Sequence, residues 1–118
     1  MKKIYHLSTC STCQRIIKSL NPGEDMELQD IKTTKITTEQ LAEMASRAGS
    51  YEALFSRRAM KYRAMGLGDK NLTENDYRDL ILEEYTFLKR PVILLGEQIF
   101  VGNTKKTVEA AQLALADL

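Results

Sequence analysis

Two cysteines separated by two residues, Cys10 and Cys13, are the side chains of this sequence best suited to chemistry. The deprotonated thiol is the nucleophile in cysteine chemistry, and its pKa falls beside positive charge or at a helix N-terminus. The Cys-x-x-Cys spacing can form a redox-active disulfide, supply half of a zinc site or have no chemical role. The surrounding sequence must decide among these alternatives.

The chain offers little for a metal. A tetrahedral zinc site needs four protein ligands, whereas the sequence has two cysteines and one histidine. We therefore expect no metal site and no bound organic cofactor. The single histidine, His6, lies four residues before Cys10, where a loop could bring the imidazole near the sulfur and favour the thiolate. A polar surface histidine without a role is the alternative.

The segment around the cysteines predicts a strand, a turn and a helix. Residues 3–7 include the β-branched Ile4 and the aromatic Tyr5, and apolar residues at helical spacing follow the cysteines. The thiols then lie at the start of the helix, where backbone N–H groups and the helix dipole stabilise a thiolate. Ser11, Thr12 and Arg15 share this position, so we count them among the candidate substrate-binding residues.

The rest of the chain predicts a β-α-β start, a helical middle and a β-β-α end. Capping residues, proline, glycine and apolar periodicity mark the boundaries. The expected elements are a strand over residues 26–31, helices that begin after Thr37 and Thr73, a hairpin of residues 92–95 and 99–101, and a helix that begins after Thr104. This order fits an α/β fold, a thioredoxin-like mixed sheet of about four strands with an inserted helical segment, in one domain over residues 1–118.

Composition excludes several classes of function. Lys and Arg number 17 against 16 Asp and Glu, so a net charge of +1 gives no global attraction to nucleic acid. The apolar runs are too short to span a bilayer, and the N-terminus lacks the apolar stretch of a secretory signal. We expect a cytoplasmic protein that contacts neither nucleic acid nor membrane directly.

Arginines supply the local positive charge. Four of the seven residues from Arg57 to Arg63 are basic, which favours either a solvated helix face or an anion site. Arg90 precedes Pro91 at the start of a predicted strand, where an X-Pro bond can be cis. A guanidinium group donates two parallel hydrogen bonds to an oxyanion, so Arg57, Arg58 and Arg90 are candidate substrate-binding residues, together with Pro91.

The chain resembles the ArsC arsenate reductase family, which includes the Spx-type regulators. The resemblance rests on His6, Cys10, Arg15, the arginine-rich middle and the Arg90-Pro91 pair before an apolar strand. It implies a thioredoxin fold with inserted helices, over essentially the whole chain.

The resemblance also implies roles. Cys10 matches the nucleophile, His6 a supporting residue, Arg90 one oxyanion-binding arginine, and Arg57 or Arg58 a second. The family's third arginine is missing, because the chain has Gly102 and Asn103 after its last strand, with Lys105 and Lys106 nearby.

Cys13 separates two functional hypotheses. One is a thiol oxidoreductase in which Cys10 attacks an oxyanion or disulfide and Cys13 or glutathione resolves the adduct, with glutaredoxin as a candidate electron donor. The other is an Spx-type switch that binds a protein such as RNA polymerase and responds to a disulfide between Cys10 and Cys13. A protein whose cysteines have no chemistry is the third alternative.

Overall fold

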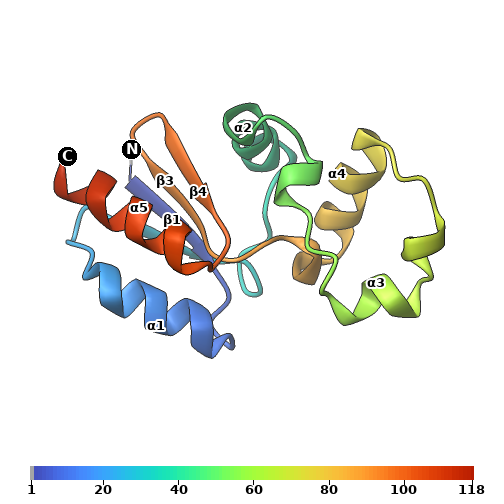
Figure 1. The fold of residues 1–118 in the computed structure, drawn as a ribbon, viewed down its shortest axis with the longest axis horizontal. Helices are drawn as coiled ribbons and strands as arrows, with labels where there is room; N and C mark the ends of the chain where they lie inside the picture. The colour runs from blue at the N-terminus through green and yellow to red at the C-terminus, as the bar shows by residue number, and fades with distance from the viewer. Residues whose placement is uncertain (1) are drawn as a thin grey trace. The chain divides into compact units, whose positions relative to one another are not determined.

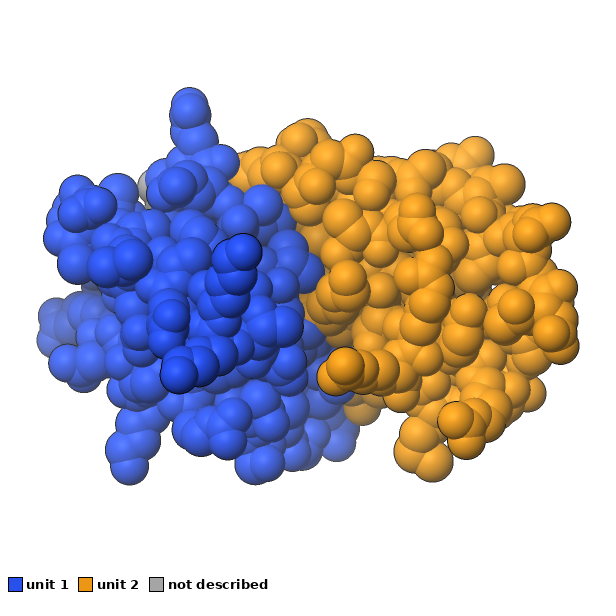
Figure 2. All heavy atoms as spheres, in the orientation of Figure 1, with its two compact units in different colours: residues 1–35, 90–118 blue, residues 36–89 orange. Residues whose placement is uncertain are grey.

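A computed structural model describes residues 2–118, which form two compact units (Figures 1 and 2). The sheet unit consists of the described residues up to 35 and those from 90 onward, and the helical unit consists of residues 36–89. The helical unit is thus inserted into the sequence of the sheet unit, as the predicted helical insertion requires. The expectation of one domain over residues 1–118 stays a prediction.

The sheet unit contains four strands in the order β2-β1-β3-β4. Strand β1 (Lys2–His6) pairs in parallel with β2 (Glu27–Asp30) and antiparallel with β3 (Val92–Leu95), which pairs antiparallel with β4 (Gln98–Val101). Helix α1 (Ser11–Leu20) provides the crossover that parallel pairing needs, and Gly96, at φ +61°, allows the tight turn of the hairpin. The predicted mixed sheet is confirmed.

Helices α1 and α5 (Lys105–Ala116) build the core of the sheet unit (Figure 1). Alternate residues of β1 and β3 face the apolar sides of both helices, as the period of two predicts. The buried residues of this cluster are Ile4, Ile16, Leu20, Met26, Ile93, Leu95 and Ala111. The core holds the end of β1 and the start of α1 together, and the two cysteines lie at that junction.

Strand β2 departs from the simple alternation in its sequence. Leu28 is 48% exposed, whereas Gln29 is buried and donates a hydrogen bond from Nε2 to the Thr34 carbonyl at 3.1 Å. Because β2 is an edge strand, the internal hydrogen bond satisfies the buried amide and the leucine remains at the surface.

The helical unit contains α2 (Thr38–Ala48), α3 (Met60–Ala64) and α4 (Glu74–Glu83), with 3₁₀ turns between them. The capping boxes predicted at Thr37 and Thr73 are present. Phe55 lies at the centre of the unit, with its ring centroid 4.9 Å from that of Tyr77 and 5.0 Å from that of Phe87. Phe55 precedes α3, Tyr77 lies in α4 and Phe87 follows α4, so the unit has an aromatic core of its own.

No helix within residues 2–118 combines the length and the hydropathy needed to cross a membrane. Within the same residues, no three His, Cys, Asp or Glu side chains gather in an arrangement that could hold a metal ion.

Candidate active site

The loop after β1 places Cys10 directly before α1. The Cys10 N–H donates to the Leu7 carbonyl at 3.0 Å, and the Gln14 N–H donates to the Cys10 carbonyl at 3.2 Å as the first bond of the helix. Both thiols are free, and Cys13 is fully buried whereas Cys10 is partly exposed. A substrate can therefore reach Cys10 more readily than Cys13.

The surroundings of Cys10 favour its thiolate. Partial burial alone would raise the pKa of Cys10, but the backbone N–H of Cys13, the Cys13 thiol, the charge of Arg90 and the backbone N–H of Thr12 outweigh it. The pKa of Cys10 is consequently held below that of an ordinary thiol. These are the contributions expected at a helix N-terminus beside a cation.

Cys13 is shifted in the opposite direction. The pKa of Cys13 is raised to about 11, chiefly by burial and also by the nearby Cys10 sulfur, while a backbone group at Leu7 and the charge of Arg90 act in the opposite direction. A proton shared by this pair therefore stays on Cys13, which donates it toward Cys10. Because the two groups interact strongly, their titration belongs to the pair.

Arg90 lies close to both sulfurs, since its charge lowers the pKa of each. The bond from Arg90 to Pro91 is cis, and Pro91 is buried at the start of β3. The Pro91 carbonyl accepts a hydrogen bond from the Gly102 N–H at 3.0 Å. The structure thus brings one predicted substrate-binding arginine to the cysteine loop.

The backbone at Gly102 disfavours an arginine at the position where the resemblance implies a third one. Gly102 has φ +97°, in the region that glycine adopts readily and that a side chain makes strained. An arginine at this position would oppose the backbone conformation that lets its N–H bond to Pro91.

Asp30 holds the cysteine loop from the neighbouring strand, a contact that the sequence patterns do not indicate. Its Oδ1 accepts hydrogen bonds from the backbone N–H groups of Ser8 and Lys32, both at 3.2 Å. Interactions with the Ser8 side chain and backbone, with Lys32 and with the charge of His6 lower the pKa of Asp30. The sequence feature that could have indicated this contact is the position of Asp30 at the carboxyl end of a strand that pairs in parallel with β1.

His6 is buried at the end of β1, beside Asp30 in the parallel register. Its Nδ1 atom is buried and has no hydrogen-bond partner within residues 2–118. The groups that lower the pKa of Cys10 are on Cys13, Arg90 and Thr12, whereas the charge of His6 acts on Asp30. The supporting role of His6 at the thiolate therefore stays a prediction.

The other candidates of the sheet unit lie along α1. Ser11 is exposed, and Thr12 is half-buried and contributes its N–H group to the Cys10 sulfur. Arg15 is exposed and lines a groove of about 520 Å³ beside Asn103 and Lys105. Arg15 is thus a cation on the helix that carries both cysteines, in addition to Arg90 before β3.

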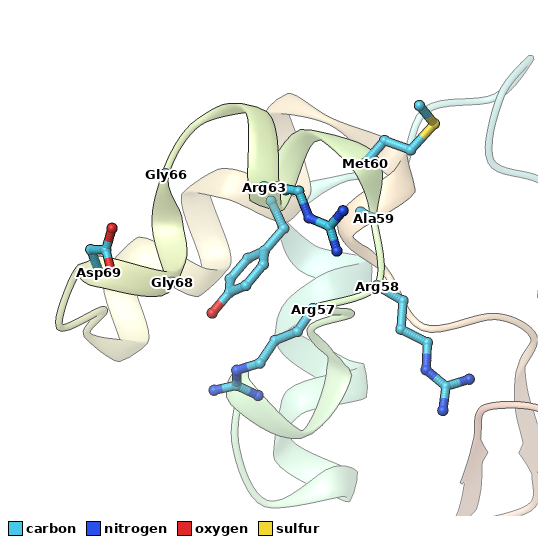
Figure 3. Close-up of a pocket in the computed structure, with 9 residues that line it drawn as sticks. Arg57, Arg58, Ala59, Met60, Arg63, Gly66, Gly68 and Asp69 are labelled. Carbon is cyan, nitrogen blue, oxygen red and sulfur yellow. The ribbon is translucent and has the colours of Figure 1, made fainter.

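Arg57 and Arg58 belong to the helical unit. Arg57 donates to Glu52 Oε2 at 2.8 Å and to the Tyr77 hydroxyl at 3.0 Å, while Arg58 is exposed. Both line a pocket of about 760 Å³ within that unit (Figure 3). Their role at the substrate of Cys10 stays a prediction.

Comparison with known proteins bears on the family and the fold. A sequence model of the ArsC family matches residues 5–111. The uncharacterized protein YusI of Bacillus subtilis (strain 168) is 26% identical over 102 residues, which cover 83% of this chain and 86% of YusI.

Solved structures give the same result for the fold. A protein solved as YffB has a TM-score of 0.80 at 22% identity, with 98% of this chain and 99% of YffB covered. An arsenate reductase from Vibrio cholerae has a TM-score of 0.78 at 21% identity, with 92% of this chain and 95% of the reductase covered. At these identities the likeness establishes the fold alone.

Proposed function

Because the chain belongs to the ArsC family, we propose that it is a thiol-dependent oxidoreductase whose nucleophile is the Cys10 thiolate. The substrate is an oxidised small molecule, either a disulfide or an oxyanion such as arsenate. Cys13 resolves the covalent adduct on Cys10, and an external thiol such as glutathione, with or without glutaredoxin, restores both thiols.

The opposite pKa shifts of the two cysteines carry this proposal. Cys10 is partly exposed and its pKa is lowered, whereas Cys13 is buried and its pKa is raised to about 11. Cys10 is therefore the thiolate that attacks first, and Cys13 remains protonated until the adduct has formed. Two structural cysteines in an apolar core would both have raised pKa values.

With a disulfide, the Cys10 thiolate bonds to one substrate sulfur and the other sulfur leaves as a thiolate. This step removes the negative charge from Cys10, which is one of the causes of the raised pKa of Cys13. Cys13 can then lose its proton to solvent and attack the Cys10 sulfur, which releases the second substrate thiolate. Two electrons have passed to the substrate, and the protein holds a disulfide between its cysteines.

With arsenate, the Cys10 sulfur replaces one oxygen, which leaves as water. Attack by a second thiol on the Cys10 sulfur breaks the sulfur-arsenic bond and leaves the electron pair on arsenic, which is reduced from As(V) to As(III). Arg90 has the charge and the position to bind the oxyanion beside Cys10. Arg57 or Arg58 would supply a second guanidinium, while Gly102 supplies none.

The experiment is NADPH oxidation coupled through glutathione reductase, glutathione and glutaredoxin, with arsenate and hydroxyethyl disulfide tested separately. We expect turnover with at least one substrate, and Cys10→Ser should reduce it by more than about a thousandfold because the nucleophile is lost. Arg47→Gln, a charge change on α2, is the matched control and should retain activity. Absence of turnover above background with both substrates would refute the enzyme proposal.

A redox-switched regulator is the second proposal, and the proximity of the two thiols supports it. A disulfide between Cys10 and Cys13 would remove the Cys10 charge beside Arg90 and so change the surface of the cysteine loop. RNA polymerase is the candidate partner. Binding of purified polymerase by the oxidised chain but not by the Cys13→Ala variant, without enzymatic turnover, would favour this function over the first.

A further inference from the structure

A second feature of the molecule lies on the helical unit, which contains neither thiol. Residues 57–60, 62 and 63, together with the turn around Gly66 and Gly68, line the open pocket of about 760 Å³ (Figure 3). Arg57, Arg58, Met60 and Arg63 are its basic and apolar exposed members, and we call them the arginine-methionine surface.

Helix α3 has two sides with different tasks. Lys61 and Tyr62 fix it to the helical unit, because the Lys61 Nζ lies 2.6 Å from Glu84 Oε2 and the Tyr62 ring packs edge-on against Phe55. Met60 and Arg63, three residues apart, share another side of the helix. The second pair is thus held in place without being used in the packing of the unit.

Met60 is the most exposed of the large apolar residues in the described chain, at 89%. A methionine side chain adapts its shape to an apolar partner, and methionine and arginine are both enriched in protein interfaces. Arg58 and Arg63 line the same pocket as Met60. The surface therefore presents an exposed apolar side chain and separate cations to solvent.

The charges of this surface are only partly neutralised. Arg57 is paired with Glu52, whereas the guanidinium groups of Arg58 and Arg63 form no ion pair within residues 2–118. Asp69 is the one acidic residue among those that line the pocket. The surface is consequently complementary to negative charge.

The directions of the arginines indicate the shape of the ligand. Figure 3 shows the side chains of Arg57, Arg58 and Arg63 extending in different directions, with Met60 pointing away from all three. A compact oxyanion needs guanidinium groups that converge on one point. An extended ligand with several negative charges and an apolar group matches the spread arrangement better.

We propose that the arginine-methionine surface binds an acidic segment of a partner protein. Carboxylates of that segment pair with Arg58 and Arg63, and an apolar side chain covers Met60. The binding step involves no covalent chemistry and does not depend on Cys10. It gives the helical unit a task in partner recognition, in which Arg63 and Met60 have no part in the thiol chemistry and Arg58 is a candidate for both.

The test measures fluorescence anisotropy of a labelled peptide rich in glutamate and leucine, titrated with the full chain. The comparison peptide carries glutamine in place of glutamate. Arg63→Glu is matched by Lys18→Glu, which gives the same net charge but alters an exposed residue of α1. Met60→Ala tests the apolar contact. All three residues are exposed, and circular dichroism verifies the fold of each variant.

We expect saturable binding of the glutamate peptide and none of the glutamine peptide. Arg63→Glu should weaken binding about tenfold, because it turns an attractive charge into a repulsive one. Met60→Ala should weaken it about threefold through the lost apolar area, and Lys18→Glu should change it by less than about twofold because distant surface charges are screened. Cys10 alkylation should be unchanged in all three variants.

Three results would overturn the proposal. The first is the absence of saturable binding, and the second is equal weakening by Lys18→Glu and Arg63→Glu, which would show a general charge effect. The third is tighter binding of a DNA duplex or of inorganic pyrophosphate than of the peptide, which would identify a different ligand. None of these results bears on turnover by Cys10, so the two proposals can fail independently.

Discussion

The cysteine loop and the arginine-methionine surface are both places where charge gathers, but the charge has different origins. At the cysteine loop it comes from backbone N–H groups at the start of α1, from a buried thiol and from Arg90 at the start of β3. On the arginine-methionine surface it comes from exposed side chains on a short helix. The first arrangement is set by strand and helix geometry, whereas the second can change with single surface substitutions.

This difference has consequences for mutation. A substitution at the cysteine loop should change the pKa and reactivity of a thiol, because the groups of the loop and Arg90 interact directly with the Cys10 sulfur. A substitution on the arginine-methionine surface should change affinity and leave thiol reactivity intact. Arg63→Glu therefore serves as the control for each thiol prediction below.

Among substitutions that leave the Cys10 nucleophile in place, the largest effect should come from Cys13→Ala. Without Cys13, Cys10 can still attack a disulfide, but no thiol of the protein releases the adduct. In a single turnover of the reduced protein without glutathione, we expect release of the second substrate thiolate to slow by about a hundredfold, while mass spectrometry shows one substrate thiol bound to Cys10. Release at the wild-type rate would mean that Cys13 does not resolve the adduct. Arg63→Glu should release both substrate thiolates normally and accumulate no adduct.

The wild-type protein should also show the raised pKa of Cys13 in the pH dependence of resolution. Attack increases as pH rises through the lowered pKa of Cys10 and then levels off, because the thiolate is fully formed. Resolution should continue to increase above that pH, because burial keeps the pKa of Cys13 raised in the adduct, but its midpoint should lie below about 11, since the charge of Cys10 no longer contributes. Single-turnover measurements across pH separate the two steps, and a common midpoint for both would contradict the assignment.

An intermediate effect should come from Arg90→Gln. The charge of Arg90 is one of the causes that lower the pKa of Cys10, so its removal should raise the midpoint of Cys10 alkylation. At a pH below the midpoint, Arg90→Gln therefore has less Cys10 thiolate than the wild type, and its alkylation is slower. Iodoacetamide labelling followed across pH measures it. Arg90→Lys keeps the positive charge, so its midpoint should lie close to that of the wild type. An unchanged midpoint in Arg90→Gln would refute the electrostatic role of Arg90.

The fold follows from local signals to a large extent. The capping box at Thr37, the glycine turn at Gly96 and the apolar periodicity of α1 each act within a few residues, so the element order can be predicted from the sequence. The sign of each thiol's pKa shift cannot, because the burial of Cys13 depends on the packing of α1 against the sheet. The Cys-x-x-Cys spacing indicates the pair, and tertiary structure distinguishes its two members.

Longer-range contacts escape the sequence patterns altogether. Asp30 and Ser8 are 22 positions apart and meet only because β1 and β2 pair in parallel. Likewise, the count of charges from Arg57 to Arg63 indicates a basic segment, but it does not separate the paired Arg57 from the free Arg63. Both distinctions require a side chain to be placed against a neighbour from another element.

The smallest effect should come from Asp30, which positions the cysteine loop without touching the thiol. Asp30→Ala removes the acceptor for the Ser8 and Lys32 N–H groups and loosens the approach to Cys10. A hydrogen bond of this kind contributes about 1 kcal/mol, and since the loop retains its other bonds, we expect kcat/KM for disulfide reduction to fall about threefold.

Asp30→Asn keeps an oxygen acceptor at the same position and should recover most of the loss, whereas a role for the carboxylate charge would leave Asn as impaired as Ala. The alkylation midpoint of Cys10 provides the second readout, because the main groups that lower the pKa of that thiol are on Cys13, Arg90 and Thr12. A lower kcat/KM at an unchanged midpoint would identify Asp30 as a positioning residue. A shifted midpoint would instead make it part of the electrostatics of the thiol, and the loop would then depend on side-chain charge as the arginine-methionine surface does.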